Sequence, residues 1–88
     1  MAMLGLDPEK MTRLAGRMKK EAGEIETAAS RLDSSLRAVG WKGPDQKKFI
    51  GEWEGTHRKS LKDAVKLLQQ ASERINKEVQ EQRSASGA

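Results

Sequence analysis

The sequence predicts an all-α protein folded as an antiparallel helical hairpin, and three observations support this prediction. Apolar residues recur at steps of three, four and seven in both halves of the chain, which is a helical period and not the alternation of a β-strand. A short segment with two glycines and a proline, residues 40–44, separates the two halves. Of the 88 residues, 35% are hydrophobic and 34% are charged, a composition typical of long helices that pack on other helices.

The first helix is expected over residues 7–39. Asp7 is a favourable N-cap, Pro8 suits the first helical position, and Glu9 complements the positive end of the helix dipole. One side of this helix is apolar and its opposite side is charged, so the apolar side should pack on another helix. The large residues of the apolar side are Met11, Leu14, Met18, Ile25, Leu32, Leu36 and Val39.

Residues 40–44 are expected to form the turn between the helices. Gly40 can end the first helix because it enters the left-handed conformation at little cost, and Pro44 is preorganised for a first helical turn. Trp41 and Gly43 should shape the turn, with Trp41 packing as a plug across the ends of the two helices. Buried in this way, Trp41 would contribute on the order of 3 kcal/mol to stability.

The second helix is expected over residues 45–82, followed by a flexible tail at 84–88. The tail consists of small and polar residues with nothing to bury. Residues 1–83 should therefore form a single helical domain. Phe49 and Trp53 are expected to pack near the turn, and the apolar side of this helix continues with Leu61, Val65, Leu68 and Ile75.

The width of both apolar sides predicts a binding partner. In an antiparallel pair each helix contacts the other along a narrow seam, so apolar surface remains outside that seam. A continuous apolar surface of this kind marks an interface. The simplest arrangement that covers it is a second hairpin, which gives a dimeric four-helix bundle.

No catalytic, metal or cofactor site is expected. The chain has no cysteine and a single histidine, His57, so it lacks the paired soft ligands of a zinc site. His57 falls within the apolar side of the second helix and should be half-buried. Glu52 and Glu54 point in different directions on a helix and form no acid/base pair, and no glycine-rich phosphate loop is present. These patterns indicate a protein that is not an enzyme and binds no small-molecule substrate.

A basic ridge on the second helix suggests an alternative function. The formal net charge is +4, and phosphate binding uses surfaces of this kind. Acidic residues intersperse the ridge, however, and no aromatic side chain accompanies it for base stacking, which argues against nucleic acid. A cytosolic helical adaptor or chaperone for a larger client is the second alternative. The ridge consists of Lys48, Lys59, Lys62, Lys66 and Lys77, with Arg58 nearby.

Neither a signal peptide nor a membrane span is expected. Residues 1–6 are too few for the apolar region of a signal peptide. No apolar run approaches the ~20 residues that a spanning helix requires. If the protein leaves the cell, it should do so without a cleaved signal.

The residues around the turn resemble those of the WXG family, the ESAT-like small proteins of type VII (ESX-like) secretion. That family has a Trp-X-Gly turn between two helices, here Trp41-Lys42-Gly43. Its second helix usually carries an aromatic residue eight positions after the Trp and another four positions later, and Phe49 and Trp53 stand at these spacings. The resemblance covers nearly the whole chain.

The resemblance implies a non-enzymatic bundle of two hairpins, formed with itself or with a sister WXG-type protein. It further implies synthesis in the bacterial cytoplasm and export, to the medium or the cell surface, as a substrate or co-secreted partner of a machine with an ATPase. Many pairs carry a Tyr-X-X-X-Asp/Glu signal after the second helix of one partner. This chain has no tyrosine and no acidic residue in 82–88. Either a partner supplies the signal and the contact with the ATPase, or the chain serves as a dimerisation module for another exported protein.

Overall fold

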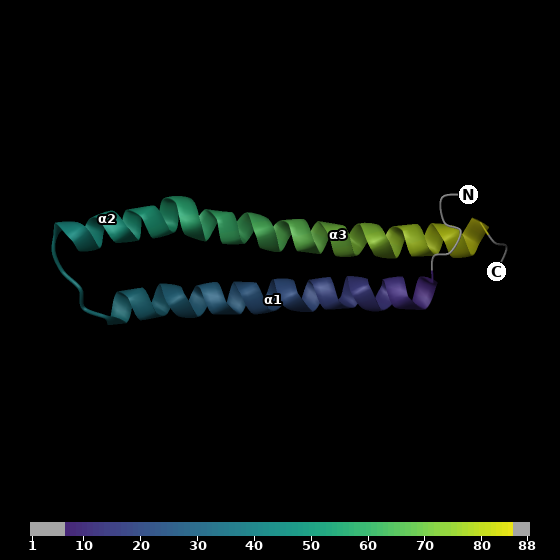
Figure 1. Cartoon of the computed structure of the whole chain (residues 1–88), viewed down its shortest axis with the longest axis horizontal. Coiled ribbons are helices and arrows are strands. Elements are labelled where there is room, and N and C mark those ends of the chain that lie inside the picture. The colour runs from purple at the N-terminus through teal and green to yellow at the C-terminus, as the bar shows by residue number, and fades with distance from the viewer. Residues whose placement is uncertain (1–6, 86–88) are drawn as a thin grey trace.

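The computed structural model of the protein describes residues 7–85 and shows a hairpin with two long helical arms (Figure 1). The first arm is helix α1 (Pro8–Ala38). The second arm consists of α2 (Pro44–Glu52), a π-helical turn η1 (Trp53–His57) and α3 (Arg58–Ala85). The arms run antiparallel and form a rod of 65 × 18 × 16 Å. The predicted all-α hairpin is confirmed.

Helix α1 begins and ends where its sequence satisfies the free backbone groups. The carboxylate of Asp7 accepts hydrogen bonds from the backbone N–H groups of Glu9, at 2.9 Å, and Lys10, at 3.2 Å. Such a cap supplies acceptors to donors that have no partner within the helix. At the other end, Gly40 adopts a φ of +70°, in the left-handed region that glycine enters most easily. This conformation turns the chain away from the helix axis.

The two arms meet along a seam of small side chains. The buried residues of each arm recur every seven positions, which keeps one side of each helix turned towards its neighbour as in a coiled coil. In α1 the buried alanines are at most 1% exposed. Residues of this size allow the two backbones to lie close together while the interior stays densely packed. The seam consists of Ala15, Ala22 and Ala29 of α1 and Val65, Ser72 and Val79 of α3.

Ser72 sets the register of the seam. Among the described residues it is the buried polar one, and its hydroxyl donates a hydrogen bond of 2.7 Å to the backbone oxygen of Ala15. A slip of one residue would leave this hydroxyl buried without a partner, which is costly. The bond therefore favours one alignment of the arms.

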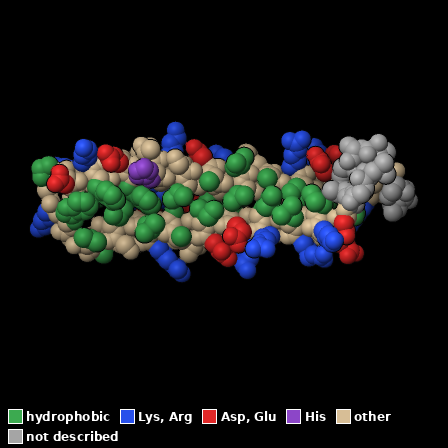
Figure 2. All heavy atoms as spheres, viewed as in Figure 1, with side chains coloured by type: hydrophobic (Ala, Val, Ile, Leu, Met, Phe, Trp, Pro, Cys, Tyr) green, Lys and Arg blue, Asp and Glu red, His purple; other side chains and the backbone are tan. Residues whose placement is uncertain are grey.

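The large apolar side chains lie outside the seam and gather on one face of the rod. Within residues 7–85 no large side chain is fully buried. Figure 2 shows hydrophobic side chains as a band that runs along both arms. We call this band the apolar face, and its residues, again spaced by seven on each arm, are Met11, Met18, Ile25 and Leu32 of α1 and Leu61, Leu68 and Ile75 of α3.

The second arm differs from the single helix expected over residues 45–82. The π-turn η1 interrupts it, and α3 continues to Ala85. No glycine or proline stands between residues 56 and 86 to stop the helix, so Ser84 and Ala85 of the expected tail are helical. The rest of that tail and the N-terminal residues 1–6 lie outside the described residues. No helix within residues 7–85 is long and apolar enough to cross a membrane.

Candidate partner-binding surface

At the hinge end, the turn exposes an aromatic pair. Gly40 and Gly43 have φ values of +70° and +109°, which let the chain reverse within a few residues. The ring of Trp41 packs on Phe49 with centroids 5.5 Å apart and planes tilted by 43°. Both aromatic side chains remain 42% exposed. Trp41 thus packs on α2 and stays partly open to solvent, and is not enclosed as a plug.

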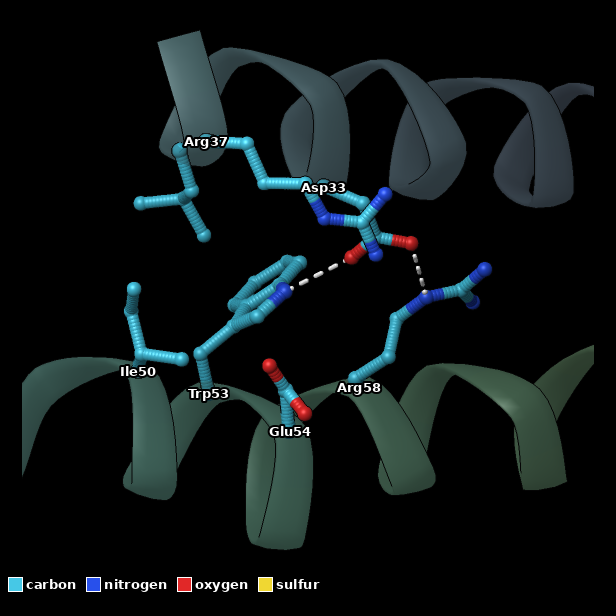
Figure 3. A pocket seen from close by; sticks show the side chains of 7 residues that line it. Asp33, Arg37, Ile50, Trp53, Glu54 and Arg58 are labelled. Carbon is cyan, nitrogen blue, oxygen red and sulfur yellow. Dashed lines mark hydrogen bonds and ion pairs between the residues drawn. The ribbon is translucent and has the colours of Figure 1, made fainter. Parts of the chain in front are cut away.

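Trp53 lies deeper and joins the two arms through Asp33 of α1. Its indole N–H donates a hydrogen bond of 2.8 Å to Asp33 Oδ1, and Arg58 Nε donates one of 3.0 Å to Asp33 Oδ2 (Figure 3). Arg58 Nη2 also lies 3.5 Å from Glu26 Oε1. We call Asp33, Trp53, Arg58 and Glu26 the hinge cluster. It connects α1 to both sides of the π-turn.

The hinge cluster favours the charged form of Asp33. The hydrogen bond from Trp53, and then the hydrogen bond and charge of Arg58, hold the pKa of the Asp33 carboxyl below its ordinary value, although partial burial opposes them. The same carboxylate raises the pKa of the Arg58 guanidinium. Both side chains stay partly open to solvent, with exposed fractions of 26% and 21%. The cluster is therefore an ion pair reinforced by an indole donor.

A pocket of about 270 Å³ opens beside the hinge cluster. In Figure 3, side chains from α1 and from the second arm line it on opposite sides. It holds acids and guanidinium groups but no serine, histidine or other nucleophile that could pair with a base. Its lining is suited to charge pairing across the arms: Asp33, Leu36, Arg37, Ile50, Trp53, Glu54 and Arg58. Within residues 7–85, no three histidine or acidic side chains gather as metal ligands.

The residues predicted for the seam and partner surface separate into three groups. Val65 lies in the seam with 7% exposure. Leu14, Leu32 and Val39 are 42%, 50% and 68% exposed and belong to no seam. The remaining predicted residues are half-buried at the margin between the seam and solvent: Met11, Met18, Ile25, Leu36, Leu61, Leu68 and Ile75.

The basic ridge and His57 differ from one another in their surroundings. All five lysines of the ridge are exposed, whereas Arg58 points into the hinge cluster and is held by acids. His57 is exposed in the single hairpin, whereas the next residue, Arg58, is half-buried against α1. The predicted place of His57 in a partner interface stays a prediction.

Sequence reasoning missed the hinge cluster and the dominance of alanine in the seam. The alanines stand seven residues apart, and this spacing alone could have identified them as the core. Asp33 gave a weaker signal: it is a lone acid next to Leu32 on an otherwise apolar side. Its pairing with Trp53 and Arg58 depends on the π-turn, which no residue pattern predicts.

These features define a small helical hairpin with an apolar face and no recognisable catalytic site in its described part. The sequence model of the WXG100 family, described as "Proteins of 100 residues with WXG", matches residues 4–86. The chain therefore belongs to the WXG100 family, as its turn and aromatic spacings predicted. That family consists of small helical proteins associated with export, which typically pair with relatives and are not enzymes.

The chain is also similar to a much larger protein. It is 32% identical over 65 residues to human "Coiled-coil domain-containing protein 154", a stretch that covers 74% of this chain but 9% of that protein. The chain spans about a tenth of this relative, so the similarity extends only to a short segment of it. No solved structure matches the chain significantly.

Proposed function

We propose that this protein pairs through its apolar face with a second hairpin and is exported as that pair by a type VII secretion system. The partner is a second copy or a sister WXG-type protein, and the product is a four-helix bundle. The chain serves in this pair as a substrate or co-secreted partner and performs no chemistry. The proposal combines a surface seen in the hairpin with the export association of the family.

The observation that carries the pairing is the division of apolar residues between seam and face. The seam is filled by alanine, valine and serine, while the large side chains are left half-buried or exposed on one side. Fully burying a leucine, isoleucine or methionine stabilises a protein by about 1.5–3 kcal/mol, and the isolated hairpin leaves much of this unused. A second hairpin on the apolar face would recover it.

The two sides of the seam differ in polarity, because the apolar face lies along one side and polar residues lie along the other. This difference supports a single preferred docking side for the partner. The opposite edge of the seam contains Lys19, Glu26 and Asp33 of α1 and Lys62 and Gln69 of α3, all polar. Burying these groups without new partners would cost free energy. The partner hairpin should therefore dock on the apolar face.

Recognition by the secretion ATPase is proposed to occur through the partner. The family signal at the end of the second helix contains a tyrosine, and this chain has none. A sister protein with that signal would direct the complex to the ATPase. This arrangement favours a heterodimer in the exporting cell.

The pairing is tested by measuring the solution mass of the full chain over a range of concentrations, with helicity recorded by circular dichroism. A helical species of twice the chain mass is expected for a homodimer. Leu32→Glu should reduce this association at least about tenfold because it places a charge on the apolar face. Ser34→Glu, an equal charge on the exposed side of the same helix, is the matched control.

If the wild-type chain is monomeric at all concentrations, a second copy is not the partner. Co-purification of the chain with a co-expressed sister hairpin then tests whether the apolar face binds that hairpin. If Leu32→Glu leaves the mass and affinity of either complex unchanged, the apolar face is not the interface. The export part is tested by following the chain in culture medium without lysis. Wild type and Ser34→Glu should appear there, and Leu32→Glu should remain in the cells.

A further inference from the structure

The π-turn places two side chains on one carboxylate. Residues advance by 100° each in an α-helix, so residues five apart point about 140° away from each other. In the π-turn the backbone N–H of Arg58 bonds to the oxygen of Trp53, five residues earlier, which brings these residues into line along the helix. This alignment lets Trp53 and Arg58 reach the two oxygens of Asp33 at 2.8 and 3.0 Å.

The π-turn also decides which side of α2 faces α1. The seam positions of α3 follow steps of three and four from Arg58. A continuous α-helix extended backwards by the same steps would turn Glu54, Gly51 and Lys47 towards α1. In the structure these three residues are exposed, and the residues one position earlier, Trp53, Ile50 and Gln46, are half-buried instead.

The orientation of α2 in turn sets the hinge-end part of the partner surface. Phe49 is adjacent to Ile50, and with Ile50 turned towards α1 it lies against Trp41. Leu32 and Val39, which are 50% and 68% exposed, lie at the same end of the hairpin. Four of the exposed large apolar residues of residues 7–85 are therefore gathered near the turn: Leu32, Val39, Trp41 and Phe49.

We infer that Asp33 is a positioning residue for partner binding: by accepting hydrogen bonds from Trp53 and Arg58 it stabilises the π-turn, which orients α2 and the hinge-end apolar residues. The π-turn offers no advantage to the local backbone, since its bonds are rarer and weaker in geometry than those of an α-helix. A tertiary contact has to favour it. π-turns inside helices occur frequently where function requires an altered side-chain direction. The consequence for binding rests on the proposed function, whereas the consequence for the π-turn does not.

The inference is tested on the full chain with Asp33→Ala and with Glu26→Ala as the matched control. Glu26 contacts only the outer nitrogen of Arg58, at 3.5 Å. Asp33→Ala should accelerate hydrogen exchange of the backbone amides of residues 53–58 by at least about tenfold, because local opening no longer breaks these bonds. Exchange in the middle of α3 should remain unchanged, and Glu26→Ala should have an effect below about threefold.

Removal of Gly55 gives the decisive comparison. Without one residue of the π-turn, Trp53 and Arg58 are four apart, and a continuous α-helix turns Ile50 and Trp53 towards α1 without help. Asp33→Ala should then change the exchange of the remaining amides of residues 53–58 by less than about twofold in the shortened chain. Equal effects in both backgrounds would show that Asp33 is an ordinary contact and would overturn the inference.

Two further measurements keep the outcomes separable. If Asp33→Ala does not fold, Trp53→Phe removes one of the two hydrogen bonds and should accelerate the same amides; unchanged exchange would contradict the inference. In the folded Asp33→Ala variant, association with a second copy or a co-expressed sister should weaken while helicity is retained. If the wild-type chain associates with neither, the proposed function fails, and the exchange experiment still decides the role of Asp33.

Discussion

Along most of the hairpin the arms meet through alanine, valine and serine, whereas at the hinge end they meet through Trp53, Arg58 and Asp33. The seam is repetitive and almost free of directional bonds, with Ser72 as the exception. The hinge end has a π-turn, an ion pair and an indole hydrogen bond. The seam brings the helices close together, and the hinge cluster determines how α2 is rotated.

This difference shows how a small protein can keep its large apolar residues available. Small side chains close the seam and leave methionine, isoleucine and leucine half-buried or exposed, as the proposed pairing requires. Such a seam does little to fix the rotation of the short helix α2. Hydrogen bonds at the hinge fix it, because they are satisfied in one geometry only.

The largest effect is expected from enlarging a residue of the seam. Ala22 is fully buried, and Ala22→Leu should destabilise the hairpin by about 2–3 kcal/mol because the arms must separate to admit the side chain. Chemical denaturation followed by circular dichroism measures this loss. Ala28→Leu, at an exposed position of the same helix, should leave stability nearly unchanged. Equal losses in the two variants would refute a close-packed alanine seam.

A smaller loss is expected from Trp41→Ala at the turn. Truncating a fully buried tryptophan costs about 3–5 kcal/mol, but Trp41 is 42% exposed, so about 1–2 kcal/mol is expected. This value revises the estimate for a buried plug. The same denaturation assay measures it, with Leu67→Ala as the control at a 67% exposed site. A loss above about 3 kcal/mol would mean that Trp41 is enclosed in solution.

A pH dependence is expected from the ion pair at the hinge. The pKa of Asp33 is lower in the folded chain than its ordinary value of 3.8, so the folded state binds this proton less readily than the unfolded state. The carboxylate therefore stabilises the fold above about pH 4, and this contribution is lost as the pH falls through the lowered pKa. Melting curves between about pH 2 and 7 should show the loss in wild type and a smaller one in Asp33→Asn. Parallel curves for the two proteins would contradict this role.

The smallest effect is an increase in stability from Gly23→Ala in α1. A Cβ at this glycine would meet no atom within 4 Å, so the seam imposes no need for glycine. Alanine should raise stability by about 0.5–1 kcal/mol through its higher helix propensity. Gly43→Ala is the opposing control, because its φ of +109° is strained for any residue with a side chain. Destabilisation by Gly23→Ala would reveal a close contact with a partner at Gly23, on the side of α1 outside the apolar face.

The sequence by itself determined the helices and the turn, and it predicted a binding partner. These properties depend on local signals: the cap at Asp7, glycine and proline at the turn, and a helical period of apolar residues. Family membership followed from the same turn and from the spacing of Phe49 and Trp53. The residue spacings were sufficient for this because each signal acts within a few positions of the chain.

Only the tertiary structure decided which apolar residues close the hairpin and which remain outside the seam. The helical period of the sequence places alanines and large apolar residues on the same side of α1. Contact with α3 buries the alanines and leaves the large residues outside the seam. The π-turn and the role of Asp33 also required the second arm, since Asp33 lies 20 and 25 residues from Trp53 and Arg58. A local α-helix is the better backbone for residues 53–57, and only bonds across the two arms make the π-turn favourable.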